Sequence, residues 1–100
     1  MAKFYNYSFY NNNKKKEMRV TLPDGQVLSV LAPTKKVLKV LTEAETTDDL
    51  YDAVAAILSR NRGGIRIKST DLEDIMDYED LVEFLQTYTA FIKSITNEKN

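Results

Sequence analysis

The sequence predicts a single α+β domain in which a β-hairpin packs on three to four α-helices, the last one long and C-terminal. Three observations predict this class. Residues 17–32 hold two β-rich runs around an Asp-Gly pair, residues 33–76 hold short runs with apolar residues at helical spacing, and residues 77–100 form one long amphipathic segment. A chain of 100 residues suits one domain with a radius of gyration of about 13 Å.

The composition excludes most common catalytic chemistry. The chain has no His, no Cys and no Trp, so it lacks the usual general base, the thiol nucleophile and the best zinc ligands. It has no phosphate-binding glycine loop, no dinucleotide-binding glycine motif and no calcium loop. We therefore expect no enzyme, no cofactor and no metal site.

The same composition suggests where the protein works. The absence of cysteine fits a reducing compartment. No apolar run approaches the roughly 18 residues needed to span a bilayer, and the first residues lack the apolar stretch of a signal peptide. We therefore expect a cytoplasmic protein without a membrane partner.

Residues 1–16 form an aromatic and polar arm or edge strand. Residues 3–10 alternate as a strand does, with Tyr5, Tyr7 and Phe9 on one side, and a polar loop follows at residues 11–16. The segment could lie over the core or bind another protein. Aromatic residues followed by lysines could also hold single-stranded nucleic acid, but a net charge of −1 makes nucleic acid the least favoured partner.

The β-hairpin at residues 17–32 is the clearest local pattern. Val20 and Leu22 alternate with polar neighbours, which indicates one buried face. Asp24-Gly25 suits the positive φ values of a tight turn, and Pro23 lies where its missing N–H costs little. Because a two-stranded hairpin is marginally stable alone, helices or the aromatic strand must cover it.

The helical part, residues 33–100, opens with two short helices. Pro33-Thr34 begins the first, and Thr46-Thr47-Asp48-Asp49 provides capping residues and first-turn acids for the second. Gly63-Gly64 follows the second helix among arginines. We interpret this as a glycine C-cap, since phosphate loops precede helix N-termini and this one follows a C-terminus. The two apolar stripes comprise Val37, Leu38, Leu41 and Ala44, then Leu50, Val54, Ile57 and Leu58.

A brief third helix and a long fourth one complete the chain. Thr70-Asp71-Leu72-Glu73 has the form of a capping box, and Asp77 is expected to cap the last helix. That helix has apolar residues on one face over about 20 residues, or about 30 Å. Its stripe comprises Leu81, Phe84, Leu85, Tyr88, Ile92 and Ile95, broadened by Val82, Ala90 and Phe91.

The last helix allows two interpretations. It can complete the hydrophobic core with the hairpin, or part of it can project and meet a partner helix. For the second case, the periodicity indicates Tyr88, Phe91, Ile92 and Ile95 as the partner-binding residues.

Charge is unevenly distributed along the chain. Residues 1–46 carry eight Lys or Arg against four acids, whereas residues 47–100 carry six against eleven. Seven acids lie between Asp71 and Glu83 without one base. This pattern fits an ordinary solvated face with acids at helix starts. It also permits self-association or a cationic partner.

Several phrases resemble the tail assembly chaperones of long-tailed phages and prophages of Gram-positive bacteria. They are the Leu-Pro-Asp-Gly hairpin, Pro33-Thr34, Asp49-Leu50-Tyr51-Asp52 leading into residues 57–61, and residues 80–92. The resemblance covers about residues 17–100. It implies a small, non-enzymatic host-cytoplasmic protein, absent from the mature virion, that binds the tape measure protein while the tail tube assembles. The major tail protein is a further implied partner.

Two other functions stay open. One is a structural protein of the virion, such as a tail completion or connector subunit. The other is a small nucleic-acid-binding regulator. In the chaperone family a longer product often arises by a backward shift of one base, and Glu98-Lys99-Asn100 could be encoded by an adenine run suited to it.

Overall fold

The computed structural model describes residues 7–12 and 15–98. A three-stranded antiparallel sheet comes first, in the order β1-β2-β3, and four helices follow. The strands are β1 (Tyr7–Asn12), β2 (Lys15–Thr21) and β3 (Val27–Leu31). The helices are α1 (Lys35–Thr42), α2 (Thr47–Ser59), α3 (Ser69–Ile75) and α4 (Tyr78–Glu98). The predicted α+β class is confirmed, and the radius of gyration is 12.9 Å.

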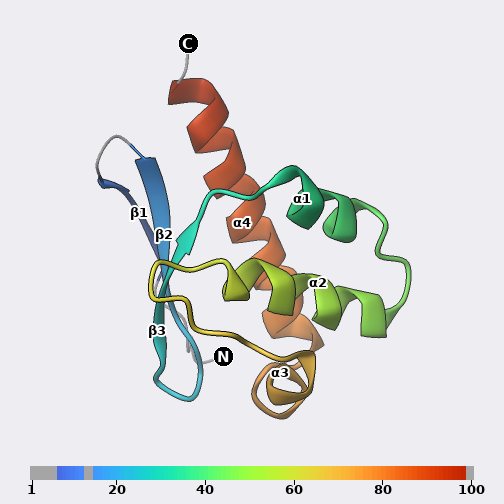
Figure 1. Ribbon diagram of the computed structural model, residues 1–100. Helices are drawn as coiled ribbons and strands as arrows, with labels where there is room; N and C mark the ends of the chain where they lie inside the picture. Colours follow the sequence, from blue (N-terminus) through green and yellow to red (C-terminus); the bar gives the residue numbers. More distant parts are fainter. Residues whose placement is uncertain (1–6, 13–14, 99–100) are drawn as a thin grey trace.

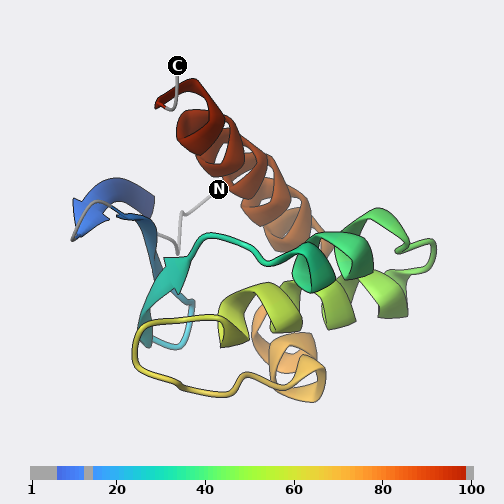
Figure 2. The same ribbon diagram turned by 45° about the horizontal axis from the view of Figure 1, so that its top comes forward.

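The helices lie on one side of the sheet in both ribbon views (Figure 1, Figure 2). α2 crosses the middle of this layer, and α4 runs behind it, past the sheet toward the C-terminus (Figure 1). Figure 2 shows the C-terminal half of α4 extending beyond α2. The helix therefore combines a packed part with a part that reaches the rim of the molecule.

The predicted first strand is confirmed over residues 7–10 and continues to Asn12. Because β1 ends at Asn12 and β2 begins at Lys15, the loop predicted at residues 11–16 is wrong at residues 11, 12, 15 and 16. Asn11 and Asn12 pair with Lys16 and Lys15, which shows that ladder hydrogen bonds outweigh the turn preference of asparagine. Residues 3–6 lie outside the described residues, as does the predicted common side of Tyr5, Tyr7 and Phe9.

The predicted hairpin at residues 17–32 is confirmed as β2 and β3. Gly25 has φ +94°, which glycine tolerates best. Its N–H donates to the Leu22 carbonyl at 2.8 Å, and the Asp24 carboxylate accepts from the Gln26 N–H at 3.0 Å. The register pairs Val20 with Leu28 and Met18 with Val30. Both pairs are buried, which places the inner face of the sheet against the helices.

α1 begins directly after Pro33-Thr34, as predicted, and two of the three predicted caps are confirmed. The Thr34 hydroxyl accepts from the Val37 N–H, and Thr46 and Asp49 form a reciprocal capping box. Asp77 and Asp80 form the reciprocal pair at the start of α4. The Asp80 N–H donates to the Asp77 carboxylate at 2.9 Å, and the Asp77 N–H donates to the Asp80 carboxylate at 3.0 Å. The capping box predicted at Thr70 is wrong, because α3 already begins at Ser69 and its N-cap, Lys68, makes no side-chain cap bond.

The end of α2 also differs from the prediction. Its C-cap is Arg60, so the predicted glycine C-cap is wrong. Instead of turning away, the chain runs along the free edge of β3, where the Leu31 N–H donates to the Arg60 carbonyl and the Arg62 N–H to the Ser29 carbonyl. Asn61 fixes the following turn through bonds to Leu58 and Ile65. Gly64, with φ +69°, comes only after this pairing.

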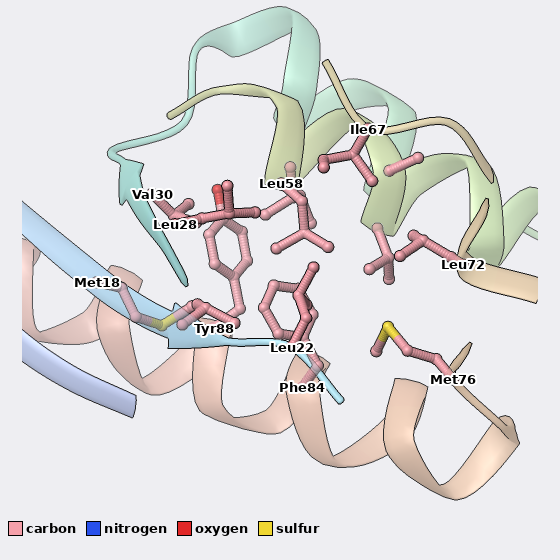
Figure 3. Close-up of a cluster of buried hydrophobic side chains, with 14 of the residues drawn as sticks. Met18, Leu22, Leu28, Val30, Leu58, Ile67, Leu72, Met76, Phe84 and Tyr88 are labelled. Atoms are coloured by element: carbon pink, nitrogen blue, oxygen red, sulfur yellow. The ribbon is translucent and has the colours of Figure 1, made fainter. Parts of the chain in front are cut away.

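One hydrophobic core joins the sheet to the helices. The rings of Phe84 and Tyr88 from α4 lie between the sheet and α2, close to Leu22, Leu28 and Leu58 (Figure 3). Their ring centroids are 5.9 Å apart in a stacked arrangement, a geometry that aromatic pairs favour. Leu72 and Met76 extend the core toward α3. The long helix is therefore a central part of the fold.

Candidate interaction surface

The start of α4 is held at a fixed position by two contacts with the preceding segment. The reciprocal Asp77 and Asp80 cap satisfies backbone N–H groups that the first turn leaves without helical partners. Tyr51 of α2 donates its hydroxyl hydrogen to the Met76 carbonyl at 2.6 Å. The helix therefore leaves the α3 region at a defined angle to α2.

The four residues proposed as partner anchors separate into two pairs. Tyr88 is 1% exposed and Phe91 is 0% exposed. Neither can be touched by a partner while the domain stays folded, which corrects their assignment as accessible anchors. The physical reason is that both side chains belong to the hydrophobic core, where their ring centroids are 6.1 Å apart. Ile92 and Ile95 are half-buried and pack against this core.

An apolar strip remains on one flank of α4. Tyr78, Val82, Leu85 and Ile92 follow one another at intervals of four, three and seven residues, which places them on one helix face. Tyr78 is 56% exposed and Val82 is 36% exposed, while Leu85 and Ile92 are half-buried. We call these four residues the α4 flank. It is about 21 Å long at the helical rise per residue.

Sequence reasoning found only part of this strip. Periodicity predicted one broad stripe, and it assigned Val82 to the margin of that stripe and Tyr78 to no role. The helix presents its apolar residues in a wide arc, but the sheet and α2 cover only one side of the arc. Periodicity gives the arc, whereas the positions of the packing partners decide which part stays open.

Helix α1 offers a second apolar surface. None of its residues is buried, although Val37 and Leu41 pack partly against the core. Val40 is exposed and Leu38 half-exposed. The helix makes its contacts mainly with α2. It is therefore the least anchored of the helices in the described part of the chain.

Acidic side chains surround the start of α4. Burial raises the pKa of the Tyr51 hydroxyl, and the nearby Asp77, Glu73 and Asp80 raise it further. The Tyr51 hydroxyl therefore lies in the negative field of these three carboxylates. The N-terminal end of the α4 flank therefore lies beside a negative surface, whereas α1 carries Lys35, Lys36 and Lys39.

A buried ion pair lies on β2, away from the α4 flank. Glu17 is 0% exposed and forms a salt bridge with the guanidinium of Arg62, which is about half exposed. The other carboxylate oxygen of Glu17, Oε1, has no hydrogen-bond partner among the described residues. The two residues are 45 positions apart, so no local sequence pattern could have predicted their contact.

The described residues contain no cluster of metal-ligating side chains and one open hollow. No group of three or more potential metal-ligating side chains comes together in residues 7–12 and 15–98. One open hollow of about 340 Å³ lies between the β2–β3 turn and α3, with Asp24, Asp71, Asp74 and Arg66 at its polar rim. No helix within the described ranges is long and apolar enough to span a membrane.

Comparison of the chain with protein-family models, with curated proteins and with solved structures finds no match.

Proposed function

We propose that this protein is a non-enzymatic binding module, and specifically a tail assembly chaperone that binds the tape measure protein of a long-tailed phage. The observation that carries the proposal is the α4 flank, an apolar strip with two exposed residues, Tyr78 and Val82, on a helix otherwise committed to the core. The resemblance of residues 17–100 to the chaperone family supports the specific assignment. In this proposal the protein acts in the host cytoplasm and is absent from mature virions.

The proposed mechanism is protection of apolar helix surface. A tape measure protein is long and helical, so its apolar stripes must be kept from one another until tube subunits cover them. A partner helix that lies along the α4 flank would bury its own stripe against Tyr78, Val82, Leu85 and Ile92 in a helix-to-helix contact. Leu85 and Ile92 are already half-buried, so the additional area is small. A small interface favours the reversible binding that later replacement by tube subunits requires.

The charge near the α4 flank suggests the polarity of the partner. Acidic residues at the start of α4, Glu79 and Glu83 among them, lie beside the exposed Tyr78 and Val82. A partner stripe bordered by lysine or arginine at this end would gain favourable electrostatic contacts and a faster association rate. Binding should therefore weaken as the salt concentration rises.

Co-expression with the long helical tail protein encoded nearby tests the proposal. We expect more of that protein in the soluble fraction and a complex that survives purification. Unchanged solubility together with no recovered complex would contradict the proposal. Purified particles provide a second test, because a chaperone should be missing from mature tails, whereas a completion or connector subunit should be retained in them.

A further inference from the structure

We infer that β1 pairs antiparallel with β1 of a second copy of this chain, which joins two three-stranded sheets into one continuous sheet. The inference does not depend on the chaperone proposal, because it concerns the sheet and not the α4 flank.

The two edge strands of the sheet, β1 and β3, differ in their hydrogen-bond partners within the described residues. At the β3 edge, residues 60–62 pair with the strand and supply hydrogen-bond partners to Ser29 and Leu31. At the other edge, β1 pairs with β2 over six residues, and no second strand within the described ranges pairs with it. An unprotected strand edge is a template for another strand.

The hydrogen bonds at β3 show which groups of β1 face outward. The backbone groups of Ser29 and Leu31 bond to residues 60–62, so they point away from β2. The backbone N–H and C=O groups of Leu28 and Val30 therefore point toward β2. Their partners Val20 and Met18 therefore face β3. By the alternation of an antiparallel ladder, Glu17 and Arg19 face β1 and bond to Tyr10 and Ser8. The backbone N–H and C=O groups of Tyr7, Phe9 and Asn11 consequently point outward.

These three residues are complementary to themselves. In an antiparallel pair with the two-fold axis at Phe9, Phe9 lies opposite Phe9 of the second copy, and Tyr7 lies opposite Asn11. At each of these positions the outward backbone N–H and C=O groups of one strand then meet those of the other. The residues opposite each other can exchange two N–H···O bonds. A shift of one residue would set outward groups against inward ones. A shift of two residues would lose one of the three pairs within β1.

The charge of the strand also permits a second copy as the occupant. Residues 7–12, Tyr-Ser-Phe-Tyr-Asn-Asn, contain no charged residue and no proline, which are two of the devices with which natural edge strands block pairing. The register at Phe9 brings no like charges together within this stretch. The net charge of the whole chain is only −1, so long-range repulsion between copies is small.

Single cysteines test the register directly, since the natural chain has none. In the full chain carrying Phe9→Cys, the two α-carbons at the axis would be about 5.5 Å apart, inside the range of about 4.4 to 6.8 Å that a disulfide needs. The matched control Asn11→Cys would place the two α-carbons about 14 Å apart. We expect treatment with diamide to cross-link the first variant into a covalent dimer and to leave the second largely monomeric.

Charged substitutions of Phe9, the residue at the two-fold axis, provide the second test. Phe9→Lys and Phe9→Glu should each raise the dissociation constant of the dimer at least about fivefold, because like charges face each other at the axis. An equal mixture of the two variants should restore dimers. Thr89→Lys, on the exposed surface of α4, should leave the dissociation constant unchanged. Sedimentation analysis over a concentration series measures all four proteins, with circular dichroism to confirm that each is folded.

Three results would overturn the inference. They are a wild-type chain that stays monomeric throughout the series, a dimer indifferent to both Phe9 charge variants, and equal cross-linking at positions 9 and 11. The last two results would indicate self-association through another surface.

Discussion

Glu17 and Arg62 show most clearly how single residues connect distant parts of this fold. Glu17 is 0% exposed on β2, and Arg62 is the last residue of the segment 60–62 that pairs with β3. A buried carboxylate is tolerated only when a cation or hydrogen bonds compensate it. The ion pair therefore links the segment after α2 to strand β2.

Removal of the cation alone should be costly. Arg62→Met leaves the carboxylate of Glu17 buried without its partner, and we expect the free energy of unfolding to fall by about 3 kcal/mol. In the double variant Glu17→Gln with Arg62→Met no buried charge remains, so most of this loss should be recovered. Urea unfolding of both proteins measures the difference. Equal loss in the two variants would contradict the importance of the buried charge.

Tyr88 gives the domain a dependence on alkaline pH. Burial raises the pKa of its hydroxyl above the ordinary value of 10.0. The unfolded chain therefore releases this proton from about pH 10 while the folded chain retains it. The stabilising contribution is complete below pH 10 and is lost as the pH rises above it, with a slope of up to about 1.4 kcal/mol per pH unit.

The substitution Tyr88→Phe removes this proton and keeps the ring. Above pH 10 its stability should fall less steeply than that of the wild type, while Tyr51, whose pKa is also raised, contributes to both proteins alike. Chemical unfolding at a series of alkaline pH values gives the two slopes. Parallel slopes would show that the Tyr88 hydroxyl is not held protonated by the core.

At the scale of elements, the caps explain where the helices begin. Thr34, Thr46 and Asp77 were predictable because the capping side chain and its N–H partner lie three residues apart. The end of α2 was not predictable, since residues 60–62 bond to a strand about 30 positions earlier. The Thr70 box failed because Ser69 is already helical. Local chemistry therefore sets the helix starts, and long-range pairing sets the path between α2 and α3.

The Asp77 cap can be compared with the mispredicted one. Asp77→Ala should lower the free energy of unfolding by about 1 kcal/mol, because it leaves the Asp80 N–H without its acceptor. Thr70→Ala is the matched control, since the α3 N-cap makes no side-chain bond, and we expect a change within about 0.5 kcal/mol. Thermal and urea unfolding of both variants provide the values. A larger effect at Thr70 than at Asp77 would reverse this assignment.

At the scale of the whole molecule, the hairpin and the helices bury one side of α4 and leave its flank partly open. The α+β class and the existence of the long helix followed from periodicity together with the Asp24-Gly25 turn. Periodicity did not predict which apolar residues of α4 are buried and which stay accessible. Tyr88 and Ile92 lie at the same helical spacing, and only the position of the sheet makes the first buried and the second half-buried. We therefore propose Tyr78 and Val82, which are exposed, in place of the buried Tyr88 and Phe91 as partner-binding residues of α4.

The most direct test of the central proposal is the affinity of the purified chain for the long helical tail protein, measured by titration calorimetry for two variants of one helix. Val82→Lys places a charge in the α4 flank, while Ala90→Lys places the same charge on an exposed position outside it. Both changes are compatible with a helix. We expect the first to weaken binding at least about tenfold, as loss of a buried apolar contact does, and the second to leave it unchanged. Equal affinities in the two variants, or no binding by the wild-type chain, would contradict the account.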